Sequence, residues 1–311
     1  MRLTARAFFA LDPATSDSDV ESEFFADLKM RNGTFKLTRR SRFIEVDRAF
    51  ASIIAERAHE LHSVLDVGAS SGITTIDLAE FLRHKGVTAT ITATDLFVRA
   101  HLVDVGPGLR LLTDSDGWPL QYDVAGVAVR PWMRRLDYFT LACVPRLVAR
   151  MFAQRVARSM IGRGKSRVVE LVSPRLARRE DVELVEDDIM RRSPAFATRF
   201  DLVRAANVLN RSYFPPEDLE RAIDNIASYL RGPGALFLVM RTNEARQNAG
   251  TLFELDQGRT FRVIARVGGG SEIEELIAGK RLASRAREVD ASLECNPPRA
   301  SLEPSGVGPQ C

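Results

Sequence analysis

Apolar residues recur along the chain at two spacings, short continuous runs and helical periods of three to four residues. In the first third of the chain these two patterns alternate. Gly86 provides a helix stop signal just before the last apolar run of that third. The spacing predicts an amphipathic helix from Arg42 to Leu61, a buried strand over 63–67, a helix over 73–84 and a strand over 88–94 that ends at Asp95.

The same alternation returns in the second half of the chain. It predicts strands over 168–172, 182–185, 200–205 and 235–240, a helix over 216–231, an antiparallel pair over 251–255 and 260–267, and a helix over 271–287. Pro216 near the start of the 216–231 helix and glycines after its end mark both boundaries. Alternating strands and helices predict an α/β fold with a mostly parallel, helix-covered sheet.

The chain between Asp95 and Val185 is far longer than one connecting helix. Within it, residues 109–129 predict a hairpin with Asp116-Gly117 as its turn, and 139–161 predict an apolar helix studded with arginines. Because structureless loops of that length are rare in compact domains, we expect an inserted lid or substrate subdomain. The predicted parts are an N-terminal segment 1–41, an α/β domain 42–97 and 174–287, the insertion 98–173 and a disordered tail 288–311.

The composition is ordinary for a globular protein, with 45% hydrophobic and 27% charged residues among 311. A net charge of +3 does not by itself imply a nucleic-acid partner, and the three cysteines lack the spacing of metal ligands. No apolar stretch reaches the length of a membrane-spanning helix. We therefore expect a cytoplasmic protein with no metal site.

The loop after the 63–67 strand contains Asp66, Gly68 and Gly72. Ligands of parallel α/β sheets bind at the carboxyl ends of the strands, and the glycines let the backbone turn sharply against a ligand. The spacing differs from the glycine loop that binds a dinucleotide pyrophosphate, which disfavours an NAD-dependent oxidoreductase. The Asp66 carboxylate instead suits a ligand with an ammonium group, such as S-adenosylmethionine.

Three further strand ends supply polar residues. Asp95 is placed to accept hydrogen bonds from both hydroxyls of a ribose. Asp188 is placed to accept from an adenine amino group while Ile189 packs on the ring. Asn207 follows the 200–205 strand, beneath the position expected for a reactive methyl group.

Taken together, these four loops resemble the class I S-adenosylmethionine-dependent methyltransferase family over about residues 60–96 and 180–241. The resemblance implies a seven-stranded Rossmann-like sheet whose insertion lies between its second and third strands. It also implies that S-adenosylmethionine is the cofactor, held by Asp66, Gly68, Ala69, Gly72, Asp95, Asp188, Ile189 and Asn207.

Methyl transfer requires in-line positioning, and a base only when the nucleophile arrives protonated. The four histidines all lie in the first third of the chain, so the polar candidates for catalysis are Asn207, Asn210 and Arg211. This set favours a carboxylate or an activated hydroxyl as the acceptor. The leading hypothesis is a methyltransferase for a small, anionic or amphiphilic molecule. The alternatives are a protein carboxyl (glutamate-type) methyltransferase and a non-catalytic S-adenosylmethionine-binding protein.

The predicted 139–161 helix is strongly basic, and Trp132 lies just before it. One interpretation is a lid helix whose apolar face packs on the core while its arginines face water. A second is peripheral contact with an anionic membrane, and a third is recognition of an anionic substrate or RNA. Aromatic residues are too sparse among the basic ones to favour nucleic-acid binding.

Overall fold

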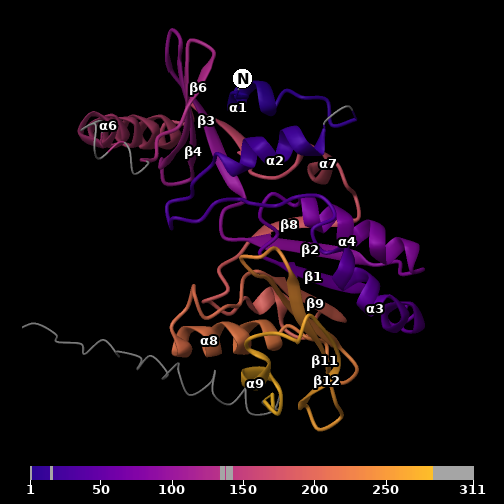
Figure 1. The fold of residues 1–311 in the computed structure, drawn as a ribbon. Helices are drawn as coiled ribbons and strands as arrows, with labels where there is room; N and C mark the ends of the chain where they lie inside the picture. The colour runs from indigo at the N-terminus through magenta and orange to yellow at the C-terminus, as the bar shows by residue number, and fades with distance from the viewer. Residues whose placement is uncertain (1, 15–16, 134–136, 138–142, 283–311) are drawn as a thin grey trace, which may run out of the picture.

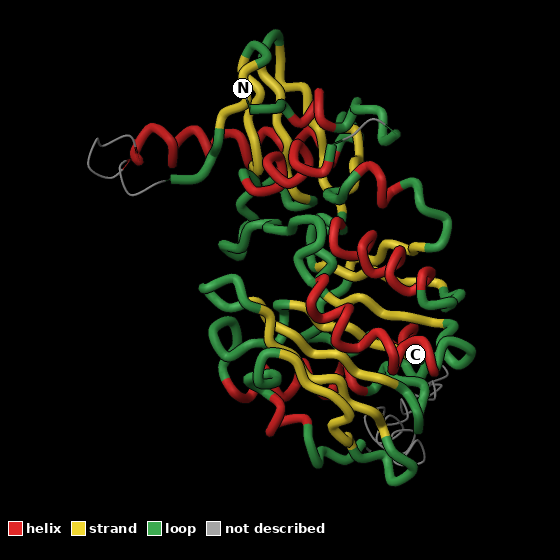
Figure 2. Tube along the Cα trace, turned by 45° about the vertical axis from the view of Figure 1, so that its right-hand side comes forward, coloured by secondary structure: helices red, strands yellow, loops and turns green. Residues whose placement is uncertain are grey.

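The computed structural model describes residues 2–14, 17–133, 137 and 143–282, and it contains two sheets (Figures 1 and 2). The larger sheet has seven strands in the order β12-β11-β10-β9-β1-β2-β8. Their bounds are Ser63–Val67 for β1, Thr90–Asp95 for β2, Val182–Glu186 for β8, Leu202–Ala206 for β9, Leu236–Thr242 for β10, Asn248–Leu255 for β11 and Phe261–Val267 for β12. Mixed α/β architecture with a seven-stranded, mostly parallel sheet is as the sequence predicts.

Five neighbouring strands, from β8 to β10, run parallel. Val64 of β1 pairs with Ile91 of β2 on one side and Leu202 of β9 on the other. β1 is buried on both faces, which explains its continuous apolar run. The predicted terminal pair is confirmed: β11 is antiparallel to β10 and β12 is antiparallel to β11.

Helices cover both faces of the large sheet (Figure 1). The helices α3 (Ile44–Glu56) and α4 (Ile73–His84) pack on one face, where they share a core with Val64 and Ile91. The helix α8 (Pro216–Ala227) packs on the other face with Leu65. Adjacent residues of β1 thus belong to different cores, as the alternating side-chain direction of a strand requires.

The segment between β2 and β8 forms a second, five-stranded antiparallel sheet in the order β6-β5-β4-β3-β7. Its strands are β3 (Arg99–Gly106), β4 (Leu109–Asp114), β5 (Pro119–Val124), β6 (Val127–Val129) and β7 (Arg167–Glu170). The hairpin predicted around Asp116-Gly117 is confirmed as β4 and β5. The helix α6 (Cys143–Gly162) packs against this sheet; residues 139–142 of the predicted helix lie outside the described ones.

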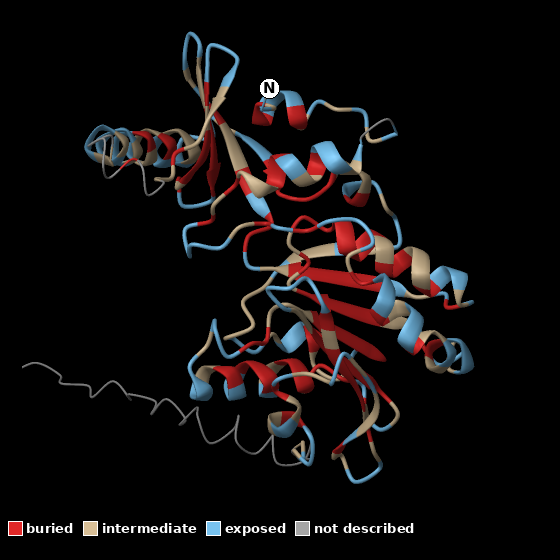
Figure 3. Cartoon of the chain, viewed as in Figure 1, coloured by how far each residue is buried: buried red, intermediate tan, exposed pale blue. Residues whose placement is uncertain are grey.

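The N-terminal segment also belongs to the second sheet. Its helices α1 (Ala5–Phe8) and α2 (Ser18–Ala26) contribute Phe8, Phe24 and Phe25 to a core shared with Leu112 of β4. The rings of Phe8 and Phe24 are stacked with centroids 3.8 Å apart. The segment 1–41, which the sequence sets apart, is therefore packed on the insertion, and the buried side of α2 is visible in Figure 3.

Two predicted elements differ in part from the structure. The 168–172 strand is β7, which pairs antiparallel with β3 in the second sheet and does not join the parallel one. The 271–287 helix shrinks, within the described residues, to α9 (Glu274–Ile277), because Gly279 takes a φ of +78° and Leu282 N donates to Arg259 O. The predicted tail, 288–311, lies outside the described residues. The remaining short elements are α7 (Pro174–Ala177) and the 3₁₀ helix η1 (Pro194–Phe196).

Candidate functional site

The carboxyl ends of β1, β2, β8 and β9 meet at one edge of the large sheet. The chain proceeds from β1 to β2 and β8 on one side, and then crosses to β9 on the other side of β1. The order in which strands are added to the sheet therefore reverses between β1 and β9. Open α/β sheets bind ligands at such a point. The structure brings together the strand ends that the sequence singled out.

The turn after β1 is built from left-handed residues, with φ of +73° at Gly68, +60° at Ser70 and +76° at Gly72. The N–H groups of Gly68 and Ala69 both donate to Thr94 O at 2.8 Å, which fixes the turn to the end of β2. A Cβ atom on Gly68 would overlap the side chain of Val208, in the loop after β9. Glycine is thus required here by close contact between two loops of the site.

Asp95, at the end of β2, holds the neighbouring turn in place. Its Oδ2 accepts from Ser70 N at 2.8 Å, and its Oδ1 accepts from Phe97 N at 3.0 Å and from Lys36 Nζ at 3.1 Å. Oδ2 therefore keeps acceptor capacity at a partly exposed position. Bidentate contact with both ribose hydroxyls, as the sequence predicts, would require Lys36 to leave Oδ1.

The segment before α3 covers the glycine turn, a feature that the sequence reading missed. Lys36 is buried, and its ammonium also donates to Ser70 O at 2.9 Å. The hydroxyls of Thr38 and Ser71 are in hydrogen-bond contact, and Ser173 N donates to Ser71 O at 2.8 Å. The N-terminal segment and the end of the insertion therefore meet at this turn.

Asp66 is committed to the interior of the protein. Arg204 donates to its two carboxylate oxygens at 2.8 and 2.7 Å, and the hydroxyl of Thr75 donates to Oδ2 at 2.6 Å. Both charged side chains are 2% exposed. Both oxygens of Asp66 thus bond to buried partners and face away from the ammonium group that we expected the residue to bind, so Asp66 joins β1 to β9 and α4.

The charge of Arg204 influences carboxyl groups on the helices that cover it. Burial raises the pKa of Asp47 to about 6, although the facing Arg204 lowers it and Asp77 adds to the rise. Burial also raises the pKa of Asp77. For Arg204 itself, burial opposes the charged form, but Asp66 and the other two carboxylates raise its pKa, so it stays charged.

The loop after β8 contains Asp188 and Ile189 at the same edge. Asp188 Oδ1 accepts from Met190 N at 3.0 Å, which forms a tight turn and leaves the second oxygen near the exposed Arg191. Ile189 packs partly against the core on the α8 face, and its carbonyl accepts from Asn225 Nδ2 at 2.9 Å. Burial and the adjacent Asp188 raise the pKa of Asp187.

The three polar candidates after β9 differ in position. Asn207 has a φ of +61°, and its Oδ1 accepts from Thr242 N at 2.7 Å, which joins the ends of β9 and β10. Asn210 is buried and caps the following turn through its own side chain. Arg211 is exposed, and its backbone N–H donates to Glu272. Asn207 is therefore the polar side chain of the three that lies at the strand end.

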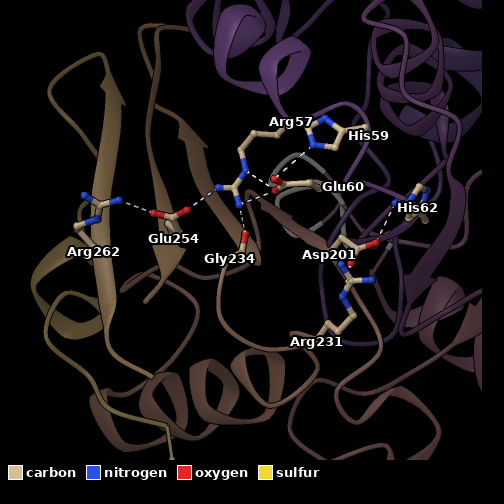
Figure 4. A network of polar contacts seen from close by, with 9 residues as sticks. All are labelled: Arg57, His59, Glu60, His62, Asp201, Arg231, Gly234, Glu254 and Arg262. Atoms are coloured by element: carbon tan, nitrogen blue, oxygen red, sulfur yellow. Dashed lines mark hydrogen bonds and ion pairs between the residues drawn. The ribbon is translucent and has the colours of Figure 1, made fainter. Parts of the chain in front are cut away.

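His59 and His62 lie away from this edge, whereas His101 lies in β3, whose first residue, Arg99, donates its N–H to Glu186 at the end of β8. His59 and His62 belong to a polar network at the opposite ends of the parallel strands, where Arg57 bonds to Glu254 and the carbonyl of Gly234 (Figure 4). This network joins α3 to β10 and β11. Among the described residues, no group of His, Cys, Asp and Glu side chains is arranged to hold a metal ion.

The sequence matches no protein-family model and no curated protein. Solved structures similar to the chain include O-, N- and carbon methyltransferases. One is the CMeT domain of the citrinin polyketide synthase, with TM-score 0.28 and 16% identity over 59% of this chain and 30% of that one. Another is an O-methyltransferase family protein from Burkholderia thailandensis, with TM-score 0.29 and 15% identity over 66% of this chain and 41% of that one.

A third is an S-adenosylmethionine-bound amino pentose methyltransferase from Micromonospora echinaspora, with TM-score 0.31 and 12% identity over 82% of this chain and 83% of that one. The chain spans less than half the length of the first two structures. The strand order defines the fold, and the residues at the carboxyl ends of the strands define the candidate site.

Proposed function

We propose that this protein is an S-adenosylmethionine-dependent methyltransferase acting on a small molecule. The observation that carries the proposal is the hydrogen bond from Ser70 N, in the glycine turn, to the carboxylate of Asp95. This contact lies at the point where the strand order reverses. A carboxylate one strand away from a left-handed glycine turn suits a ligand with a ribose. The glycine spacing differs from that of a pyrophosphate-binding loop, which disfavours a dinucleotide.

The residues at this edge fit that cofactor in three places. Asp95 Oδ2 is placed to accept from a ribose hydroxyl, and the partly exposed Asp188 from an adenine amino group, with Ile189 beside it. The glycine turn presents backbone close to these side chains. Asp66 is outside this set because its oxygens bond to Arg204 and Thr75.

S-adenosylmethionine supplies a methyl group on a positively charged sulfur, ready for direct transfer. The protein then has to orient the acceptor atom and exclude water, which residues around Asn207 are placed to do. Because the loops after β9 and β10 contain no histidine, we propose an acceptor that needs no strong base, such as a carboxylate or an already ionised hydroxyl. The second sheet, joined to the site through Ser173 and Ser71, is proposed to cover the acceptor pocket.

The direct test uses cofactor labelled in its methyl group. The intact protein is incubated with separate lipid, protein, nucleic-acid and small-molecule fractions of a cell lysate, and an Asp95→Ala variant serves as the control. The proposal predicts label in small molecules with the wild type and much less with the variant. Base-labile label in protein would support a protein carboxyl methyltransferase instead, and cofactor binding without labelling of any fraction would support a non-catalytic binding protein.

A further inference from the structure

The helix α6 has apolar residues on two opposite faces. On its inner face, Ala153 and Ala157 are buried against Val103 of β3 and Leu111 of β4. This contact anchors the C-terminal half of the helix to the second sheet. Figures 1 and 2 show that α6 extends beyond that sheet, away from the rest of the protein.

The outer face of the N-terminal half exposes large apolar side chains. Exposed fractions are 59% for Val144, 41% for Leu147, 62% for Val148, 65% for Met151 and 64% for Phe152. Their spacing of three and four residues places them side by side on one stripe of the helix. We call these five residues the outer stripe. Exposed apolar groups gathered in this way mark a binding surface more often than scattered single ones.

The charged residues of α6 itself have one sign. Between Asp137 and Glu170 the sequence contains no acidic residue and seven basic ones, Arg146, Arg150, Arg155, Arg158, Arg163, Lys165 and Arg167. Arg155 is exposed and continues the outer face toward the C-terminus of the helix, whereas Arg158 donates through Nε to Asp116 O of the β4–β5 turn at 2.7 Å. An apolar stripe that continues into arginines is suited to a surface that is both apolar and negatively charged.

We propose that α6 is a membrane-docking helix that lies on a bilayer containing anionic lipids. The outer stripe inserts among the acyl chains, and the arginines contact the lipid phosphates. The positive charge disfavours a second copy of this chain as the occupant, since self-association through this face would bring like charges together. No helix among the described residues is long and apolar enough to cross a membrane.

This proposal is separate from methyl transfer. The outer stripe lies on a helix that packs against the second sheet. Among the described residues, no hydrogen bond or ion pair joins it to Asp95, the glycine turn or Asn207. Binding to a membrane is therefore measurable whether or not the protein binds a cofactor.

The test is co-sedimentation of the intact protein with vesicles of phosphatidylcholine alone or mixed with phosphatidylglycerol. The variant V148D/M151D places two charges in the outer stripe without touching the inner face. V127D is the matched control, because Val127 of β6 is 59% exposed but lies outside α6. R155E reverses one exposed charge on the outer face.

We expect the wild type and V127D to bind the phosphatidylglycerol vesicles and to dissociate at high salt. V148D/M151D should bind at least about tenfold more weakly, because it loses apolar insertion. R155E should bind the anionic vesicles about tenfold more weakly. The proposal fails if the wild type stays in the supernatant, or if both α6 variants bind as it does. A wild-type dimer that V148D/M151D dissociates would assign the stripe to a second copy and overturn the membrane proposal.

Discussion

Carboxylates at the ends of neighbouring parallel strands have different chemical surroundings in this protein. Asp66 bonds only to buried partners, Arg204 and Thr75. Asp95 bonds to a backbone N–H of the glycine turn and to Lys36, at a partly exposed position. At the residue scale, Asp66 thus joins β1 to β9 and α4, and Asp95 is the carboxylate available to recognise a ligand.

Replacing Asp95 by alanine is expected to weaken binding of S-adenosylhomocysteine by about tenfold to a hundredfold, since a charged hydrogen bond is lost. The affinity is measured by calorimetric titration of both proteins. Asp104→Asn, on the exposed end of β3, is the control and should bind as the wild type does. Equal affinities of the Asp95 variant and the wild type would remove Asp95 from the cofactor site.

Replacing Arg204 by methionine leaves Asp66 buried without its cation. The free energy of unfolding should fall by about 3 to 5 kcal/mol, as measured by urea denaturation. The double variant Asp66→Asn/Arg204→Met removes both charges and should recover much of that loss. If the double variant loses as much stability as Asp66→Asn and Arg204→Met lose in sum, the two residues do not act as a unit.

Asp47 makes stability depend on pH. Its folded-state pKa of about 6 lies above the ordinary value of 3.8, so the unfolded chain loses this proton first as the pH rises. Ionisation of Asp47 therefore lowers the free energy of unfolding progressively as the pH rises from about 4 to about 6. Asp47→Asn should be more stable than the wild type by about 1 to 3 kcal/mol at pH 8. Denaturation at pH 8 and pH 4 checks this, because the difference should nearly disappear at pH 4.

At the scale of elements, the two ends of α4 offer a matched comparison. Gly72 before the helix and Gly86 after it have similar φ values of +76° and +78°, but a Cβ would overlap Leu176 only at Gly72 and meets nothing within 4 Å at Gly86. Gly86→Ala should cost about 1 kcal/mol from backbone strain alone. Gly72→Ala should cost about 2 to 4 kcal/mol in the same urea denaturation, because Leu176 must also move. Equal losses would show that crowding at Gly72 is unimportant.

The sequence predicts the bounds of β1 and α4 as the structure has them, because a buried parallel strand and a glycine-bounded helix leave strong local patterns. The 271–287 helix is wrong because Gly279 and the pairing of Thr260 with Arg281 override its helical spacing. The role of α1 and α2 was not predictable from local pattern, since their phenylalanines are buried only against distant strands.

The residues of the site at the strand ends were predictable, but the segment before α3 that covers the glycine turn was not. Asp95, Asp188 and Asn207 follow apolar runs, so topology alone brings them to one edge. Lys36 is remote in sequence and has no pattern that places it over Ser70. A signal for the Asp66 pair did exist, because Arg204 interrupts a buried apolar strand and a buried cation requires a partner.

At the scale of the molecule, the N-terminal segment and the insertion form one second unit beside the large sheet (Figure 2). Contacts between the units gather near the candidate site: Lys36 with Asp95, Ser173 with Ser71, and the N–H groups of Val98 and Arg99 with Glu186. This arrangement places a second sheet beside the proposed cofactor edge and leaves the outer stripe of α6 exposed to solvent. The proposed cofactor site and the proposed docking helix therefore lie in different parts of the molecule.

Calorimetric titration of the intact protein with S-adenosylhomocysteine tests the central claim most directly. We predict saturable binding of one molecule per chain, with NADH and ATP failing to bind because the glycine spacing is not that of a pyrophosphate-binding loop. Absence of S-adenosylhomocysteine binding by folded protein, or preferred binding of NADH, would contradict it.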